Sequence, residues 1–263
     1  MREERVKVDG CELAVMVAGD GPAVVMLHGA GSTGMAWTPT IGVLSPHYTC
    51  IVPDLPACGQ SSLPGEFWSV VRYGHAMVDL LHHFGFSAAH WVGNSFGAMV
   101  AAEVAAAHPS AVQRLALVAP PPVDEALAAA TILALLRFVG DDGRAAFRSV
   151  EHLRLISPQA SEALMQLANA NLAACRWFYE TLAAVAGYPY RQRLPRVKAA
   201  TWLAWGGQDG LTPPSASEGW RRLLAAPVEE NVFPEAGHCP QFDVPLAFNP
   251  RLRAFLAGGS GTS

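Results

Sequence analysis

The sequence has few charged residues and no cluster of basic ones. Only 15% of its 263 residues are Asp, Glu, Lys or Arg, and the formal net charge is -4. A protein that binds nucleic acid usually carries a basic patch, so the composition argues against a nucleic-acid partner. The 22 acidic and 18 basic residues are dispersed along the chain, a pattern that favours solubility.

The sequence also lacks a hydrophobic run long enough to cross a membrane. Although 51% of the residues are hydrophobic, they come in short blocks interrupted by Gly, Pro and charged residues. The longest nearly apolar block, residues 126–136, is far shorter than the ~20 residues that a spanning helix needs. The N-terminal segment MREERVKVDG has no apolar core of a secretory signal, so we expect a cytoplasmic location without a membrane span.

Cysteine is scarce and its spacing is irregular. The five cysteines form an odd, scattered set without a C-x-x-C pair, which argues against a disulfide framework and against a zinc knuckle. We expect buried or incidental thiols. The cysteines are Cys11, Cys50, Cys58, Cys175 and Cys239.

Short apolar runs alternate with segments of helical periodicity. Most of these runs are continuous, which is typical of strands buried on both faces of a parallel sheet. The predicted strands are 23–27, 49–52, 89–92, 115–118, 201–205 and 229–233, and the predicted helices are 69–85, 96–108, 215–224 and 245–256. Alternating strands and helices predict an α/β fold.

Residues 121–195 interrupt this alternation with several helical patterns and no convincing strand. Such an insertion either adds packing at a sheet edge or forms a lid over a binding site, and we favour the lid. The predicted organisation is a core domain of residues 1–120 and 196–257, a helical cap of 121–195, and a flexible tail, GGSGTS, at 258–263.

Ser95 lies in the pentapeptide GNSFG, between a predicted strand and a predicted helix. This is the context of a nucleophile elbow, in which a strained turn presents a serine hydroxyl above the sheet. Gly93 and Gly97 would remove the β-carbons that block a close approach of strand and helix. An ordinary turn is the alternative, but the flanking elements favour a catalytic serine.

A serine nucleophile needs a base, and His238 is the best candidate among nine histidines. It follows a late strand in the glycine-bearing loop EAGHCP, although a surface-loop histidine is the commoner fate of such a residue. Asp209, in GGQDGLTP, follows the preceding strand and could orient the imidazole, or merely bond its own turn. Asp124 is the alternative carboxylate.

The order Ser95, Asp209, His238 is the chain order found in α/β-hydrolases. The loop HGAGSTGMAW, which follows strand 23–27, completes the predicted machinery. It can present the backbone N–H of Ala30 to a developing oxyanion, with the N–H of Phe96 as the second donor. His28 is expected to shape this loop.

With these motifs the sequence resembles the α/β-hydrolase fold superfamily, in particular its cap-bearing single-chain serine hydrolases. These include bacterial esterases, C–C bond hydrolases and cofactor-free haloperoxidases. The resemblance runs from Val6 to Leu256 and rests on His28-Gly29, DLPACGQS, GNSFG, GGQDGLTP and AGHCPQFDVP. It implies an eight-stranded, mostly parallel sheet flanked by helices, an inserted helical cap, and a site that requires no metal or organic cofactor.

Some residues depart from the subfamilies that the sequence resembles. Ala57 replaces a glycine in the motif D-x-P-G-x-G-x-S, and Phe96 and Cys239 stand where many C–C hydrolases have Met and Trp. Asn94 matches the C–C hydrolases and could serve a substrate oxygen or fix the elbow. Related epoxide hydrolases and haloalkane dehalogenases would have Asp in place of Ser95.

The sequence therefore predicts a serine hydrolase of a small or medium, largely apolar ester, with a thioester or a lactone as variants. A C–C bond hydrolase or lyase, and a non-catalytic ligand-binding protein on the same fold, remain alternatives. We expect Trp37, Asn94, Trp177 and Phe242 to contact a small-molecule substrate. Further cap residues that could line an apolar pocket are Leu127, Ile132, Leu135, Leu136, Phe138, Leu172, Phe178 and Tyr179. The sequence predicts no oligomeric state.

Overall fold

The computed structural model describes residues 1–137 and 145–258, with one eight-stranded sheet at its centre. The strand order is β1-β2-β4-β3-β5-β6-β7-β8; β2 is antiparallel to β1 and β4, and the pairs from β4 to β8 are parallel. The strands are β1 (Arg2–Val8), β2 (Cys11–Ala18), β3 (Ala23–Leu27), β4 (Thr49–Pro53), β5 (Ala89–Asn94), β6 (Val112–Val118), β7 (Thr201–Gly206) and β8 (Val228–Phe233). The predicted α/β class and mostly parallel sheet are confirmed.

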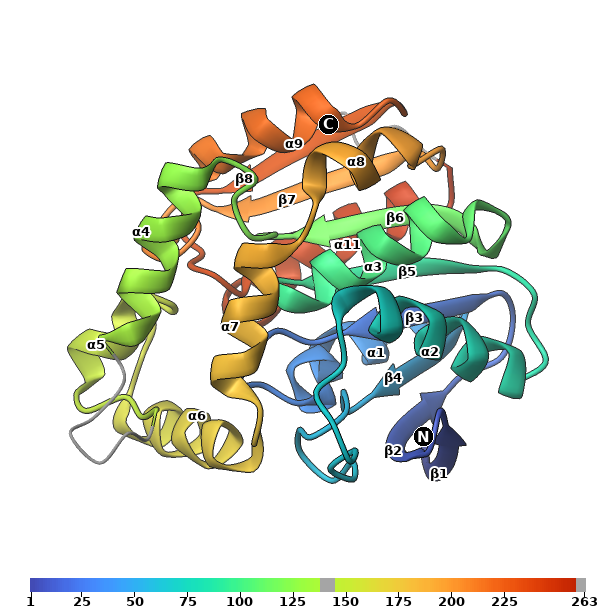
Figure 1. Cartoon of the computed structure of the whole chain (residues 1–263), viewed down its shortest axis with the longest axis horizontal. Coiled ribbons are helices and arrows are strands. Elements are labelled where there is room, and N and C mark those ends of the chain that lie inside the picture. The colour runs from blue at the N-terminus through green and yellow to red at the C-terminus, as the bar shows by residue number, and fades with distance from the viewer. Residues whose placement is uncertain (138–144, 259–263) are drawn as a thin grey trace.

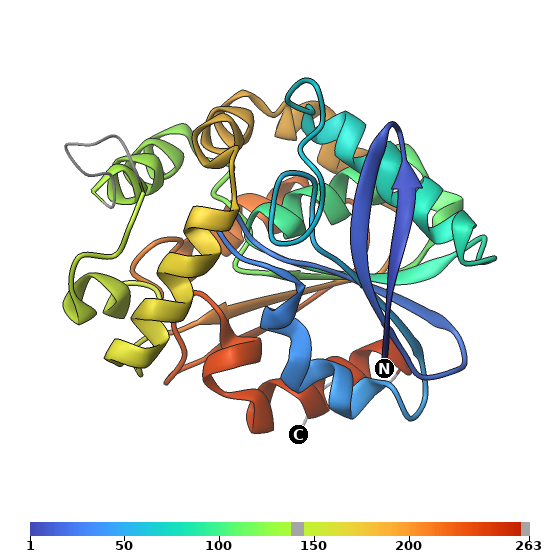
Figure 2. The same cartoon turned by 90° about the horizontal axis from the view of Figure 1, so that it is seen from below.

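Helices cover both faces of this sheet (Figures 1 and 2). Side chains of α2, α3 and α9 join one apolar core with the sheet, and side chains of α1 and α11 join the other. Figure 2 shows α1 and α11 below the sheet and α2 and α3 above it. The bounds are α1 (Thr38–Leu44), α2 (Val70–His83), α3 (Phe96–Ala107), α9 (Ser217–Leu223) and α11 (Pro245–Leu256).

The chain between β6 and β7 is helical, as predicted. Figure 1 shows α4, α5, α6 and α7 grouped on the side to which the arrowheads of β6 and β7 point. They are α4 (Glu125–Leu136), α5 (Val150–Arg154), α6 (Glu162–Ala174) and α7 (Phe178–Gly187). The short helix α8 (Tyr190–Arg193) and the following 3-10 turn, Leu194–Arg196, pack instead against α3.

Two parts of the predicted organisation fall outside the described residues. Phe138 and the end of the helical pattern around it belong to residues 138–144. The predicted tail, apart from Gly258, belongs to residues 259–263. Within residues 1–137 and 145–258, no helix combines the length and apolar character that crossing a membrane requires.

Candidate active site

Ser95 occupies the turn between β5 and α3 in a backbone conformation with φ 54° and ψ -118°. A positive φ is uncommon for a residue with a side chain, so this conformation persists only where the surroundings impose it. The Ser95 N–H donates to the carbonyl oxygen of Val118 at 2.9 Å, and the Ser95 carbonyl accepts from the N–H of Ala98 at 3.0 Å. The turn is thereby fixed between β6 and the start of α3.

Two glycines permit α3 to lie close to the ends of β5 and β3. A β-carbon at Gly93 would lie 2.2 Å from the carbonyl oxygen of Gly97, and one at Gly97 would lie 2.3 Å from that of Leu27. Both contacts are with backbone atoms, which cannot move aside as a flexible side chain can. The predicted role of these glycines in the elbow is confirmed.

His238 and Asp209 form a buried pair at the ends of neighbouring strands. His238 Nδ1 lies 2.8 Å from Asp209 Oδ2, and each residue is only 5% exposed. Asp209 Oδ1 also accepts hydrogen bonds from the N–H groups of Leu211 and Thr212, at 2.8 and 2.9 Å. Asp209 therefore bonds its own turn and orients the imidazole at once, so the two interpretations of this residue are compatible.

The alternative carboxylate, Asp124, has a different role. Its side chain caps α4, because Oδ1 accepts hydrogen bonds from the N–H groups of Ala126 and Leu127, both at 3.1 Å. It is exposed, whereas Asp209 is buried. The geometry favours Asp209 as the partner of the imidazole.

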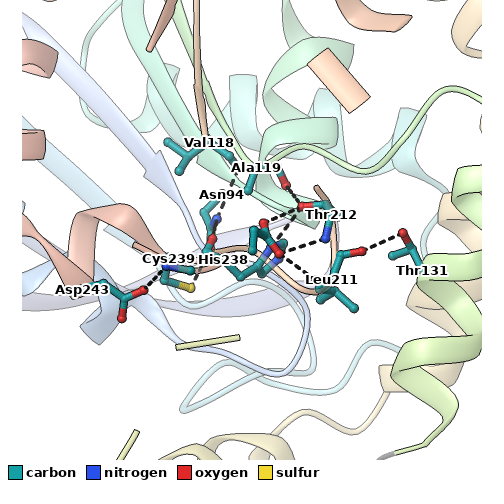
Figure 3. A network of polar contacts seen from close by, with 11 residues as sticks. Asn94, Val118, Ala119, Thr131, Leu211, Thr212, His238, Cys239 and Asp243 are labelled. Carbon is teal, nitrogen blue, oxygen red and sulfur yellow. Dashed lines mark hydrogen bonds and ion pairs between the residues drawn. The ribbon is translucent and has the colours of Figure 1, made fainter. Parts of the chain in front are cut away.

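Thr212 is a site residue that the sequence motifs did not single out. Its hydroxyl donates to Asp209 Oδ2 at 2.8 Å and lies 3.1 Å from His238 Nδ1 (Figure 3). The side chain is 1% exposed. The threonine lies three residues after Asp209 in DGLTP, a spacing at which side chains in turns commonly bond one another. Thr212 fixes the carboxylate that faces the imidazole.

Ser95 and His238 line the same cavity, which has a volume of about 450 Å³. In the part of the chain that the structure describes, the Ser95 hydroxyl makes no hydrogen bond with His238. A bond between a nucleophile and its base is often long before substrate binds, so this arrangement is compatible with proton transfer. The structure thus brings the three residues to one site but bonds only two of them.

The loop after β3 lies directly beside the serine. A β-carbon at Gly29 would lie 3.1 Å from the β-carbon of Ser95. The N–H groups of Ala30 and Phe96 donate no hydrogen bond to any other described residue, so both are available to an oxyanion. This availability suits the expected pair of donors.

His28 shapes this loop. Its Nδ1 lies 2.8 Å from the carbonyl oxygen of Gly29, and its Nε2 accepts a hydrogen bond from the N–H of Leu55 at 2.8 Å. With Nε2 accepting, Nδ1 carries the proton and donates to Gly29. Burial lowers the pKa of His28, which favours the neutral ring that this arrangement needs. His28 is therefore a part of the loop and not a free base.

Asn94 supports the histidine loop from β5. Its amide donates to the carbonyl oxygens of His238 and Val118, at 3.0 and 3.2 Å, and its side-chain oxygen accepts from the Cys239 thiol at 3.4 Å (Figure 3). Burial raises the pKa of this thiol, which makes it a poor nucleophile. Of the two roles considered for Asn94, fixing the local structure has the observed contacts.

The cavity wall is largely apolar and comes from both the core and the helical segment between β6 and β7, the predicted cap. Of the four predicted substrate contacts, Asn94 and Phe242 line it. Trp37 is 0% exposed and packs in the core beside α1 and α11. Trp177 makes a T-shaped contact with Phe67, with 5.3 Å between the ring centroids. The structure corrects the expectation for these two tryptophans, since neither lines the cavity.

The cap contributes apolar side chains from α4, α6 and α7. The predicted residues found in the wall are Ile132, Leu135, Leu172 and Phe178. Sequence reasoning missed other apolar wall residues, namely Phe147, Leu153, Ile156, Leu164, Leu167, Leu182 and Val185. Leu127, Leu136 and Tyr179 are absent from the wall, because helical spacing alone does not tell which face of a helix meets a cavity.

No group of three or more His, Cys, Asp and Glu side chains is arranged to hold a metal ion among the described residues. The cavity is lined by a serine and by a histidine whose imidazole is hydrogen-bonded to a buried carboxylate.

Comparison with known proteins places the chain in a family. The profile of the alpha/beta hydrolase fold family matches residues 22–245, and the chain belongs to this family. An uncharacterised protein of Mycobacterium tuberculosis is 38% identical over 111 residues, which cover 42% of this chain and 33% of that protein. The chain thus spans about a third of the length of the Mycobacterium relatives that it matches.

Longer matches agree with this assignment. A pimeloyl-[acyl-carrier protein] methyl ester esterase of Vibrio vulnificus is 27% identical, and the match covers 90% of this chain and 95% of that protein. The crystal structure of a bacterial membrane phospholipase A has a TM-score of 0.82 at 27% identity, and covers 98% of this chain and 86% of that one. The fold and these relatives support a hydrolase.

Proposed function

We propose that this protein is a serine hydrolase that cleaves a carboxylic ester through an acyl-enzyme. The observation that carries the proposal is the buried hydrogen bond between His238 and Asp209 at the cavity that Ser95 also lines. The similarity to a methyl ester esterase supports ester chemistry.

In the proposed first step, Ser95 Oγ attacks the carbonyl carbon while its proton moves to His238 Nε2. Since Nδ1 faces Asp209, the proton of the neutral ring lies on Nδ1 and Nε2 is free to act as the base. Asp209 then stabilises the imidazolium that forms. The N–H groups of Ala30 and Phe96 receive the negative charge that develops on the carbonyl oxygen.

The alcohol then leaves, and water releases the acyl group from Ser95 by the same proton transfers. The imidazolium gives its proton to the leaving alkoxide, and the C–O bond of the ester breaks to leave the acyl group on Ser95. Water then attacks the acyl carbon as its proton moves to His238 Nε2. The bond between the acyl carbon and Ser95 Oγ breaks, and the imidazolium returns the proton to Oγ. The products are a carboxylic acid and an alcohol.

The cavity favours a substrate with an uncharged, largely apolar acyl group. Its described wall contains no Lys, Arg or Glu, and the carboxyl of Asp243 would repel a carboxylate at the end of an acyl chain. A volume of about 450 Å³ lies within the range of ~300–1,000 Å³ that is typical of small-molecule pockets. A small or medium ester fits this space, and a polymer does not.

The test is intact-mass analysis after treatment with a fluorophosphonate, with Ser95→Ala as the control. We expect one adduct on the wild-type protein, located at Ser95, and none on the variant. A folded wild-type sample that takes up no reagent would overturn the proposal and would favour a ligand-binding protein without turnover.

Ester chemistry is distinguished from C–C bond cleavage by substrate. We expect aryl esters of increasing acyl length to be hydrolysed up to the length that fills the cavity, and vinylogous diketones to be poor substrates. In a C–C hydrolase Asn94 could point at a substrate oxygen. Here its amide group donates two hydrogen bonds to backbone carbonyl oxygens. Faster turnover of the diketones would identify a C–C hydrolase.

A further inference from the structure

A short cap segment, Leu155–Ser157, lies against both the loop that carries Asp209 and the loop that carries His238. The carbonyl oxygen of Leu155 accepts a hydrogen bond from the N–H of Gly210 at 3.0 Å, next to Asp209. The carbonyl oxygen of Ile156 accepts one from the N–H of His238 itself at 2.6 Å. The backbone of this segment is thus hydrogen-bonded to the backbone of the histidine that is the proposed base.

The approach is close enough to exclude a side chain on the core side. A β-carbon at Gly237 would lie 2.2 Å from the carbonyl oxygen of Ile156 and 2.8 Å from Pro158 Cδ. One at Gly210 would lie 3.0 Å from the carbonyl oxygen of Leu155. Glycine at both positions lets the segment dock on the loops.

Side chains complete the attachment. Ser157 Oγ donates a hydrogen bond to Asp243 Oδ1 at 2.5 Å, and the N–H of Gly237 donates to Asp243 Oδ2 at 2.8 Å. Asp243, at the end of α10 (Pro240–Asp243), therefore links the cap segment to the residue that precedes His238. Each of its carboxylate oxygens thus accepts one of these two hydrogen bonds.

We propose that Ser157 and Asp243 are positioning residues, which hold segment 155–157 against the histidine loop so that the imidazole is aligned only while the cap is docked. The inference rests on the serine hydrolase function proposed above. It makes catalytic competence depend on the cap: a displacement of the segment that admits substrate also removes the hydrogen bond to the His238 N–H.

The experiment compares kcat and KM for one aryl ester, together with Tm, across matched variants. Ser157→Ala and Asp243→Ala remove the link. Ser157→Thr keeps the hydroxyl, and Asp243→Asn keeps an acceptor for Gly237 and gains a donor for Ser157. Tyr188→Phe is the control, because the Tyr188 hydroxyl makes a cap-to-core hydrogen bond with Glu103 that does not touch the site.

A misplacement of about 1 Å at a reacting group can cost ~10²-fold in rate, so we expect kcat to fall about 10- to 100-fold in both alanine variants. KM for an uncharged aryl ester should change much less than kcat, because the variants alter polar side chains of a wall that is otherwise largely apolar. The threonine and asparagine variants should recover most of kcat. Tyr188→Phe should lower Tm without lowering kcat.

Two results would overturn the positioning role: alanine variants that lose no more kcat than Tyr188→Phe, or an asparagine variant as inactive as Asp243→Ala. Fluorophosphonate labelling separates this from failure of the underlying function. A wild-type protein that is neither labelled nor active overturns both proposals. A labelled, active wild type with fully active alanine variants overturns the positioning role alone.

Discussion

At the scale of single residues, the site depends on how Asp209 is held. The carboxylate accepts hydrogen bonds from two backbone N–H groups, the Thr212 hydroxyl and the imidazole. Replacing Asp209 with Asn should lower kcat roughly 10⁴-fold, because an amide in this place favours the wrong imidazole tautomer. Steady-state kinetics with an aryl ester measure this. A loss comparable to that of an exposed substitution such as Asp124→Asn would remove Asp209 from the mechanism.

Thr212 offers a milder change at the same carboxylate. Thr212→Val keeps the shape of the side chain but removes one donor to buried Asp209 Oδ2, which should reduce the free energy of unfolding by about 1–3 kcal/mol and lower kcat. Thr212→Ser, which retains the hydroxyl, is the matched control. Chemical denaturation and kinetics on the same samples test both effects. Equal stability and activity in the valine variant would contradict this role.

Asp243 gives a prediction about pH. Burial raises its pKa in the folded protein, against which the hydrogen bond from Ser157 acts in the opposite direction. A raised folded-state pKa means that protonation favours folding, and this contribution is lost as the pH rises through the folded pKa. As the pH rises from about 4, the ordinary pKa of an Asp side chain, through the raised pKa of the folded protein, stability should therefore fall more steeply, or rise less, in the wild type than in Asp243→Asn. Denaturation at several pH values tests this, and parallel curves would contradict it.

At the scale of elements, the buried strands were predictable and the edge hairpin was not. Runs such as AVVML and TWLAW are apolar throughout because β3 and β7 are covered on both faces. β1 reads REERVKV and buries only Val6 and Val8, so its charges hide it from a search for apolar runs. The missed signal is Asp9-Gly10, both with positive φ, in a two-residue hairpin turn.

The site was predictable to a similar degree. The positions of Ser95, Asp209 and His238 follow from strand ends that share one edge of the sheet. Ser95 and His238 do line one cavity, and Asp209 is hydrogen-bonded to His238. The tryptophans and much of the cap wall were not, because proximity in sequence to a motif does not say which way a side chain points. Trp37 is next to wall residues Ala36 and Thr38, yet it faces the core.

The glycines of two helices should respond in opposite ways to alanine. Gly42 lies exposed within α1 with nothing near an added β-carbon, so Gly42→Ala should stabilise the protein by about 0.5–1 kcal/mol. In Gly97→Ala the β-carbon would meet the backbone of Leu27 at 2.3 Å, and we expect a loss of about 3 kcal/mol or more with loss of activity. Denaturation curves of the two variants test this, and equal effects would refute the account of the elbow.

At the scale of the whole molecule, the end of the cap is tied to α3 by a buried charge cluster. Glu103 is 0% exposed and accepts hydrogen bonds from Arg193 Nε at 2.8 Å and from the Tyr188 hydroxyl at 2.5 Å. Tyr188, Tyr190 and Leu194 are part of the same apolar core as α2 and α3. The chain that leaves the cap is thus anchored in the core before it enters β7.

Removing one partner of this cluster should be costly. Arg193→Met leaves the Glu103 carboxylate buried without its cation, and we expect about 3–5 kcal/mol of destabilisation. The double variant with Glu103→Met, which buries no charge, should recover part of this loss. Thermal or urea denaturation measures both. The double variant could instead lose a second amount of stability as large as that lost in Arg193→Met. The cost would then lie in packing and not in the uncompensated charge.

The contacts of segment 155–157 also bear on which sequence changes this protein can tolerate. Leu155 and Ile156 act on Gly210 and His238 only through their carbonyl oxygens, and any amino acid supplies that atom. These hydrogen bonds therefore tolerate a change of side chain at residue 155, whereas the side chain of Ile156 also lines the cavity. Adding or deleting a single residue between α5 and Ser157 would move both carbonyl oxygens away from the N–H groups that they bond. In this segment the number of residues is more tightly constrained than the identity of residue 155.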